Sequence, residues 1–360
     1  RVLFRSVGVG GLGLMLSPSA KHLSGSKTAQ FIRIHDRGTQ DPRRDASRQD
    51  WQAHGAQLVP DLDSLVGDGD FDGVVICAGK NGDDCQVLRS LTPLLKQKCS
   101  SLPFILHFST VSSSFVQAAY EYLQSQDITY VNYPLTGGPA GAEAASMLIL
   151  ASGDPEVFHS LEPALNQIGN PKYFGPKATA GAEVKLIGQL MVFNGLTGIC
   201  SAAALKSECF QEPLSGSEQA EFFDFLNAGA GGTRQWDVAL SKGVRHNVWD
   251  QGFMLQHAAV DAIYAAHLCL EQGLSAVTVM PMLCTALSFA FVLNKYQGAP
   301  LATHSVVREL ISENAAQIDS FVQEHLDFSS PEQSMYAAIY TLPPRIQDSV
   351  LLDVDQSIFG

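Results

Sequence analysis

A glycine-rich turn near the start of the chain has the spacing of a phosphate-binding loop. Gly8-Val9-Gly10-Gly11-Leu12-Gly13 follows the G-x-G-x-x-G pattern between a predicted strand and a predicted helix. Such glycines permit a tight turn and let the backbone approach a pyrophosphate, which the amides at a helix N-terminus then face. We therefore predict a dinucleotide site at Gly8, Gly10, Gly11, Leu12 and Gly13. A glycine turn without a ligand is the alternative, and Pro18 disfavours a regular helix after it.

An acidic residue closes the second predicted strand. Asp36 follows Gly13 at roughly the separation, about 20 residues, at which a carboxylate meets the adenosine ribose of NAD. Arg37 comes next, and Arg43 and Arg44 follow in the same loop, where guanidinium groups suit the 2′-phosphate of NADP. The two signals conflict, so NAD and NADP both stay open. An ordinary turn with solvated arginines is the alternative to both.

Two polar residues share one face of a long apolar segment. Lys185 and Gln189 are spaced i to i+4 within residues 178–203, which we predict to form a buried helix. The lysine ammonium could exchange a proton with a substrate hydroxyl or carbonyl oxygen while hydride passes to or from nicotinamide. On the helix pattern alone, a lysine that extends from the helix flank into solvent is the simpler interpretation.

A second glycine loop follows a later strand. Thr136-Gly137-Gly138 comes directly after residues 130–135, a predicted strand. Open α/β sheets bind ligands at the carboxyl ends of their strands, so the backbone amides of Thr136, Gly137 and Gly138 could hold a substrate carboxylate. A plain turn is the alternative.

Alternating strands and helices position these residues in the first half of the chain. Near-continuous apolar runs such as Val74-Val75-Ile76-Cys77 suit strands that are covered on both faces, as in a parallel sheet. We therefore predict an α/β fold with a doubly wound sheet of the Rossmann type. The predicted strands cover residues 2–10, 30–36, 72–78, 104–110 and 130–135, and 146–151 could add one more at the far end.

Helical patterns replace strand patterns in the second half. Strand signals stop after the Gly/Pro-rich stretch 169–176, and helical patterns then cover 178–203, 219–226, 252–272 and 304–325. Ser330-Pro331-Glu332 resembles an N-cap with proline at the first helical position. We predict a dinucleotide-binding domain at 1–178 and an all-helical substrate and dimerisation domain at 179–330, joined by the long helix. We also predict a C-terminal extension at 331–360.

The amino-acid composition limits the kinds of partner that the chain can bind. Lys plus Arg number 23 against 36 Asp plus Glu, and this net charge of -13 disfavours nucleic acid and anionic lipid surfaces. The chain has no run of about 18 uninterrupted apolar residues and no secretory pattern at its start, so we expect a cytoplasmic protein without a membrane partner. Its seven scattered cysteines lack C-x-x-C spacing, which favours free thiols, and we expect no metal.

Taken in order, these segments resemble the β-hydroxyacid dehydrogenase family, which includes 3-hydroxyisobutyrate dehydrogenase and tartronate semialdehyde reductase and is related to 6-phosphogluconate dehydrogenase. The resemblance implies hydride transfer between nicotinamide and a small β-hydroxy acid or semialdehyde, with Lys185 as general acid/base. It also implies that Thr136, Gly137 and Gly138 hold the substrate and that Ser109 and Thr110 lie near the nicotinamide. The resemblance rests on residues 8–13, Asp36-Arg37, Ser109-Thr110, 134–138, 181–185, 226–229 and 253–261.

Several positions depart from the family pattern. Gly188 replaces an asparagine, although Gln189 supplies an amide nearby, and Val260-Asp261 replaces a lysine-aspartate pair; we expect Gln189 and Asp261 to contact the substrate. His107 replaces an aspartate, and we expect it to pack at a strand end. The proline that usually follows the Ser-Thr pair is missing from residues 111–114.

These departures leave two alternative functions, an imine reductase of the same architecture and a module that binds a dinucleotide without turnover. Because the helical half is apolar, we also expect a homodimer.

Overall fold

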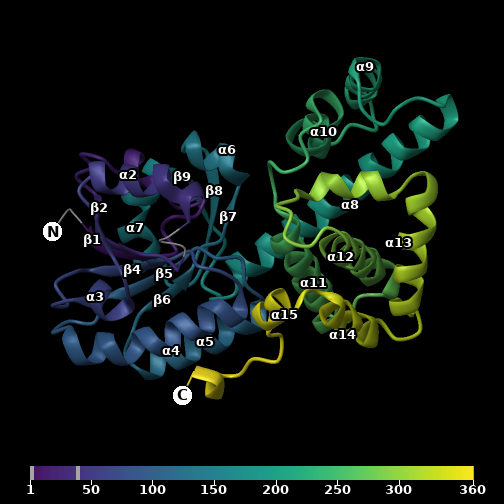
Figure 1. Cartoon of the computed structure of the whole chain (residues 1–360). Helices are drawn as coiled ribbons and strands as arrows, with labels where there is room; N and C mark the ends of the chain where they lie inside the picture. The colour runs from purple at the N-terminus through teal and green to yellow at the C-terminus, as the bar shows by residue number, and fades with distance from the viewer. Residues whose placement is uncertain (1–3, 38–40, 360) are drawn as a thin grey trace. The chain divides into compact units, whose positions relative to one another are not determined.

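The computed structural model describes residues 4–37 and 41–359 (Figure 1). The described chain divides into two compact units. The first runs to Lys185 and takes up the chain again from Leu351, and the second is Leu186–Val350. Between them, the two units contain the predicted sheet and the predicted helices.

A six-stranded parallel sheet forms the centre of the first unit. Its order, β3-β2-β1-β4-β5-β6, has the first strand in the middle and the later strands added on either side of it. This arrangement confirms the predicted doubly wound sheet. The strands are β1 Phe4–Val9, β2 Ala29–His35, β3 Gln57–Val59, β4 Gly73–Ile76, β5 Phe104–His107 and β6 Tyr130–Asn132.

Helices cover both faces of this sheet (Figure 1). Val7, Val74 and Ile105 point to one face, where they pack against α3 (Leu62–Val66), α4 (Asn81–Lys98) and α5 (Ser113–Ser125). Side chains on the other face, such as Val75 and Leu106, pack against α1 (Ser19–His22), α2 (Asp45–Ala53) and α7 (Pro155–Ile168). Burial on both faces explains why the strands have continuous apolar runs.

A second, three-stranded sheet contains a strand that the sequence pattern missed. Its order is β7 (Leu135–Thr136), β8 (Met147–Ala151) and β9 (Gly169–Tyr173). Strand β9 lies inside the Gly/Pro-rich stretch 169–176, which the sequence pattern did not identify as a strand. Pro171 pairs with Ile149 within β9, which lies at the edge of the sheet, where a residue without an amide proton is tolerated.

The helix expected directly after the glycine turn is also different. Residues 11–18 form turns, and α1 begins only at Ser19. Pro18 precedes α1 and has no amide proton to donate to an earlier turn of helix. The amides of the turn, and not the start of a long helix, are therefore the groups available to bind a phosphate.

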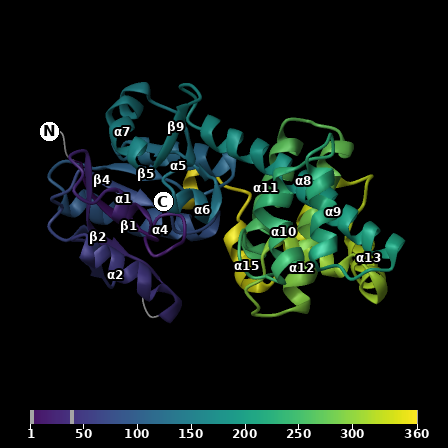
Figure 2. The same cartoon turned by 90° about the horizontal axis from the view of Figure 1, so that it is seen from above.

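The second unit is entirely helical among its described residues, as predicted. Helix α8 enters this unit from the first, and Figure 2 shows α9 to α13 in the same unit. The segment predicted as one helix at 304–325 is divided into a 3-10 helix, Thr303–Glu309, and α13. The helices are α8 Ala180–Phe210, α9 Ser217–Asn227, α10 Ser241–His246, α11 Leu255–Glu271, α12 Ala276–Lys295, α13 Ser312–His325, α14 Pro331–Thr341 and α15 Pro344–Val350, with a π-helical segment at Trp236–Leu240.

Two of these helices, α8 and α12, are long and apolar enough to cross a membrane by length and composition alone. Within their most apolar windows, 39% of α8 and 56% of α12 is buried inside the structure. A core helix passes the same test, and α12 is in the unit's core, with Leu283, Ala286 and Phe289 buried.

The C-terminal residues do not form a single extension. Helix α14 begins at Pro331, where the sequence predicted a proline at the first helical position, and it packs on α11 and α12. From Leu351 the chain returns to the first unit, where Phe359 stacks on Tyr122 and meets Phe115 edge-on. Residues 356–359 therefore lie beside α4 and α5 (Figures 1 and 2).

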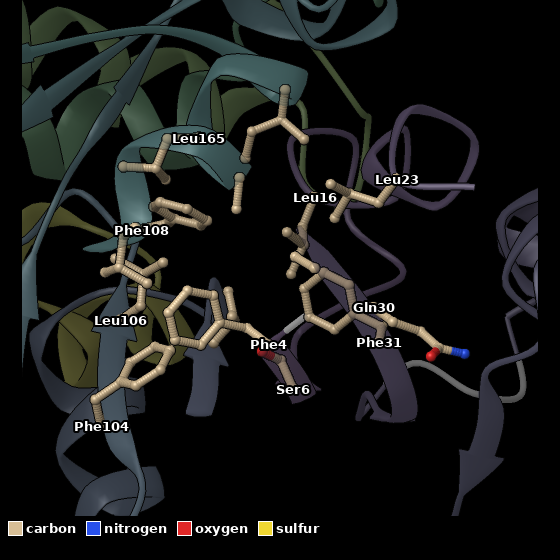
Figure 3. A pocket seen from close by; sticks show the side chains of 15 residues that line it. Phe4, Ser6, Leu16, Leu23, Gln30, Phe31, Phe104, Leu106, Phe108 and Leu165 are labelled. Atoms are coloured by element: carbon tan, nitrogen blue, oxygen red, sulfur yellow. The ribbon is translucent and has the colours of Figure 1, made fainter. Parts of the chain in front are cut away.

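An apolar cavity of about 40 Å³ lies between the large sheet and α7 (Figure 3). Phe4, Ala29 and Phe104, the first residues of β1, β2 and β5, line it together with Leu161 and Leu165 of α7. The cavity is therefore near the amino ends of the strands, whereas the glycine turn follows the carboxyl end of β1. It is a packing defect and not the cofactor site.

Candidate active site

The glycine turn is wedged between its neighbouring strands. Gly10 has a φ of +79°, and a Cβ built there would lie 2.3 Å from the carbonyl oxygen of Cys77. A Cβ on Gly11 would lie 2.5 Å from Ile34 Cγ2. Only glycine fits these positions, and the absence of side chains leaves the backbone open to a close ligand. The turn thus fits a dinucleotide phosphate.

Asp36 follows β2 and binds the glycine turn. Its Oδ2 accepts a hydrogen bond from the Leu12 amide at 3.1 Å, and its Oδ1 forms an ion pair with Arg44. Arg37 instead donates to Asp83 Oδ1 at 2.8 Å. The side chain of Arg43 is outside the described residues. In the sequence, Asp36 favoured NAD and the nearby arginines favoured NADP. In the structure, Asp36 is buried and one of these arginines, Arg44, forms an ion pair with it.

Ser109 and Thr110 follow β5 at the carboxyl edge of the sheet. Ser109 Oγ accepts a hydrogen bond from the Ala78 amide at 3.2 Å, and its carbonyl oxygen accepts one from Asn132 Nδ2, also at 3.2 Å. Ala78 also lies against Gly10, because a Cβ on that glycine would be 2.6 Å from its Cα. Ser109 is therefore close to the glycine turn, and its hydroxyl proton can be donated to a ligand.

His107 is part of a buried polar row beneath this loop. Its Nε2 lies 2.8 Å from Asp84 Oδ2 and its Nδ1 lies 2.8 Å from the Tyr130 hydroxyl. Burial, and secondarily the nearby Asp84 carboxylate, raises the pKa of Tyr130 well above its ordinary value. The tyrosine therefore remains a neutral hydrogen-bond donor, and His107 packs at the strand end as expected.

The Thr136 loop leaves the sheet through two glycines with positive φ. Thr136 ends β7, and Gly137 and Gly138 have φ values of +129° and +65°. The short helix α6 (Gly138–Glu143) begins directly afterwards. Thr136 and Gly138 are half-buried and Gly137 is exposed, so parts of this backbone can reach a ligand. Carboxylate binding here stays a prediction.

Lys185 is a buried residue in the second turn of α8. It belongs to the same compact unit as the glycine turn, although more than half of α8 lies beyond it in the sequence. Because Lys185 is buried, the interpretation of a lysine extended into solvent no longer applies to it. Its part in proton transfer stays a prediction.

Gln189 and Asp261 contact each other in the second unit. Gln189 Nε2 donates to Asp261 Oδ2 at 2.6 Å, which joins α8 to α11, and both side chains are buried. Val260, which stands where the family pattern has a lysine, is fully buried. Substrate contact by Gln189 and Asp261 stays a prediction.

Lys80 is a buried cation that no sequence pattern singled out. Lys80 comes four residues after the end of β4 and is 6% exposed. The rule that ligands bind at the carboxyl edge of a parallel sheet points to this residue as much as to Ser109. A lysine at this edge can attract an anionic ligand. Among the described residues, no group of three or more His, Cys, Asp or Glu side chains could hold a metal ion.

Comparison with known proteins adds independent observations. Residues 6–184 match a family model described as the NAD binding domain of 6-phosphogluconate dehydrogenase. The chain is 25% identical over 190 residues to 2-(hydroxymethyl)glutarate dehydrogenase of Eubacterium barkeri, a match that covers 52% of this chain and 59% of that relative, less than two thirds of its length. It is 26% identical over 286 residues to an uncharacterized oxidoreductase of Synechocystis sp., covering 78% and 91%.

A solved structure shares the fold. The 3-hydroxyisobutyrate dehydrogenase of Mycobacterium tuberculosis, solved with L-serine, superimposes with a TM-score of 0.66 at 19% identity. The match covers 86% of this chain and 100% of that one. It supports the combination of a Rossmann-type sheet and a helical unit.

Proposed function

Because this chain belongs to the β-hydroxyacid dehydrogenase family of NAD-binding oxidoreductases, we propose that it transfers hydride between nicotinamide and a small β-hydroxy acid or semialdehyde. The observation that carries the proposal is that Lys185 is buried in the same compact unit as the glycine turn. Two relatives support it, since the one from Eubacterium barkeri is named 2-(hydroxymethyl)glutarate dehydrogenase and one from Arabidopsis thaliana is named a probable 3-hydroxyisobutyrate dehydrogenase-like protein.

In this proposal the protein's residues bind, orient and move a proton. The nicotinamide ring, when bound, supplies or accepts the hydride. Lys185 donates a proton from Nζ to the substrate oxygen during reduction and takes it back during oxidation. The backbone of Thr136, Gly137 and Gly138 holds the substrate carboxylate, and the Ser109 hydroxyl donates toward the nicotinamide end of the cofactor. Gln189 and Asp261 are the remaining proposed substrate contacts.

We propose NAD as the preferred cofactor. The buried carboxylate of Asp36 can accept a hydrogen bond from a ribose hydroxyl, whereas it would repel a 2′-phosphate at the same place. Arg44, a cation that could offset this repulsion, is already paired with Asp36. Calorimetric titration with NADH and NADPH tests this directly. Tighter binding of NADPH than of NADH would refute the assignment, and Asp36→Ala should narrow the difference between the two.

The reaction itself is tested by following NADH and NADPH absorbance across a panel of hydroxy acids, semialdehydes, aldehydes and imines. We expect Lys185→Ala to lose about 100-fold or more in turnover on the best substrate, in line with typical general acid/base contributions. Lys172→Ala is the matched control, because Lys172 is an exposed lysine in the same unit. Full turnover by Lys185→Ala would refute the role of this lysine.

The same panel separates the alternatives. Reduction of imines without oxidation of hydroxy acids would identify an imine reductase. Cofactor binding by calorimetry without turnover of any member would identify a binding module instead of an enzyme.

We also propose a homodimer in the cytoplasm, without a membrane partner. Ile187, Met191 and Leu205 are apolar residues exposed on α8, and Gly198 is spaced seven residues from both Met191 and Leu205. Glycine weakens a helix, and a Cβ on Gly198 would meet nothing within 4 Å, so no contact within the chain requires a glycine at this position. Close approach of a second copy of the chain would explain it. Light scattering that gives a monomer mass would refute the dimer, and recovery of the protein with membranes would refute the location.

A further inference from the structure

The first turn of α8 contains a carboxylate that binds three neighbours. Glu183 Oε1 accepts hydrogen bonds from Lys177 Nζ at 2.6 Å, Thr179 Oγ1 at 2.8 Å and Ser113 Oγ at 3.1 Å. Burial raises the pKa of Glu183, but these hydrogen bonds outweigh it, so the pKa lies below its ordinary value. The carboxylate is therefore ionised at neutral pH and binds all three donors in that form.

One of these donors, Ser113, is the first residue of α5. It occupies the segment in which the family pattern has a proline, so its hydroxyl provides a contact that a proline could not make. The preceding residue, Ser112, caps α5 and is bound from the other side by Asn81, whose Nδ2 donates to Ser112 Oγ at 2.7 Å. The start of α5, three residues after Thr110, is thus held between α4 and α8.

The first turn of α8 is also seated on the smaller sheet. A Cβ on Gly181 would lie 2.4 Å from the carbonyl oxygen of Leu150, and the Gly181 amide donates to Ser152 Oγ at 2.9 Å. In an α-helix the amide of Lys185 bonds to the carbonyl of Gly181, and the lysine side chain leans back over this turn. The position of the first turn therefore determines where the amine of Lys185 lies.

We propose that Glu183 is a positioning residue, which together with Ser113 sets the distance between the amine of Lys185 and the Ser109–Thr110 loop. This inference rests on the proposed function. Without the carboxylate, the start of α8 keeps its seat on β8 but loses its bond to α5. A displacement of about 1 Å at a reacting group can lower turnover about 100-fold, whereas the glycine turn takes part in none of the bonds of Glu183 and keeps its affinity for the cofactor.

The test compares turnover numbers and Michaelis constants for NADH on the best substrate of the panel. We expect Glu183→Ala to lower kcat about 10- to 100-fold with the KM for NADH within about twofold of wild type. Ser113→Ala should give a smaller loss of kcat. Glu183→Gln should recover most of the activity, because an amide oxygen still accepts from Ser113 and Thr179. Glu156→Ala is the matched control, since Glu156 is an exposed glutamate in the first turn of α7.

The outcomes distinguish the two proposals. If Lys185→Ala lowers kcat but Glu183→Ala and Ser113→Ala do not, the positioning role is wrong and the proposed function stands. If Lys185→Ala retains full turnover, or wild type turns over no member of the panel, the proposed function fails and the positioning role fails with it. Should Glu183→Ala not fold, Ser113→Ala decides: a kcat equal to that of wild type overturns the inference, and a lower kcat with the KM for NADH unchanged supports it.

Discussion

Replacing Gly10 by alanine tests the glycine turn most sharply. At a φ of +79° an L-residue is strained by roughly 1–2 kcal/mol. The new Cβ would also lie 2.3 Å from the Cys77 carbonyl oxygen and 2.6 Å from Ala78 Cα, and these backbone atoms cannot rotate away. Such overpacking costs about 1–3 kcal/mol more. We therefore expect Gly10→Ala to lower the free energy of unfolding by roughly 2–5 kcal/mol.

Gly13→Ala is the matched control in the same turn. Its added Cβ would have one neighbour within 4 Å, the Gly10 carbonyl oxygen at 3.5 Å, which is an ordinary contact. Gly13 also does not have a positive φ. We expect its stability to be close to that of wild type.

Urea unfolding followed by tryptophan fluorescence and circular dichroism measures both variants. Trp51 is a suitable reporter, because its buried Nε1 donates to the Gly11 carbonyl oxygen at 2.8 Å. Calorimetry with NADH should also show at least about tenfold weaker binding by Gly10→Ala, equivalent to about 1.4 kcal/mol. Equal unfolding midpoints for the two variants, or unchanged NADH affinity in Gly10→Ala, would refute the geometry described for this turn.

Three further predictions follow from burial. Ala29→Val should fill part of the cavity of about 40 Å³ under α7 and stabilise the first unit by up to about 1 kcal/mol, at about 24 cal/mol per Å³; an unchanged or lower melting temperature would contradict this. Burial lowers the pKa of His304 below its ordinary value of 6.5, so the unfolded chain takes up the proton more readily and stability is lost as pH falls below about 6.5. Urea unfolding between about pH 7 and pH 5 should show a weaker loss in His304→Gln, and equal slopes would contradict the assignment. Desolvation raises the pKa of the half-buried Cys77 and the buried Cys200 to about 12, so iodoacetamide should label the exposed Cys209 first in the native protein. Mass spectrometry that finds Cys77 or Cys200 labelled earlier would contradict these raised pKa values.

Local patterns in the sequence were sufficient for most of the fold. Apolar runs such as Val74–Ile76 identify strands that are buried on both faces, and the change to helical periodicity near residue 178 identifies the second half. Exceptions have local causes that the pattern does not resolve. Pro171 suggests a loop, although an edge strand tolerates it, and Gln57–Val59 is too short to stand out as a strand.

The sequence predicted individual residues of the candidate site. It did not predict which of these residues contact one another. The sequence places Asp36, Arg37 and Arg44 near one another, but only the structure shows that Arg44 pairs with the acid while Arg37 binds Asp83. The sequence showed that the proline that follows the Ser-Thr pair in the family pattern is missing after Thr110. The hydrogen bond from Ser113, which lies in this segment, to Glu183 joins residues 70 positions apart, so no local sequence pattern could predict it.

The sequence by itself determined the glycine turn, the alternation of strands and helices in the first half, and the residue types available for proton transfer. Each of these features depends only on residues that are close together in the sequence. Tertiary structure alone decided which of those residues are buried together. It brings Gln189 to Asp261, returns the residues after Leu351 to the first unit, and seats Gly181 on β8. Such contacts depend on how separate elements pack, and packing between distant segments leaves no periodic trace in the chain.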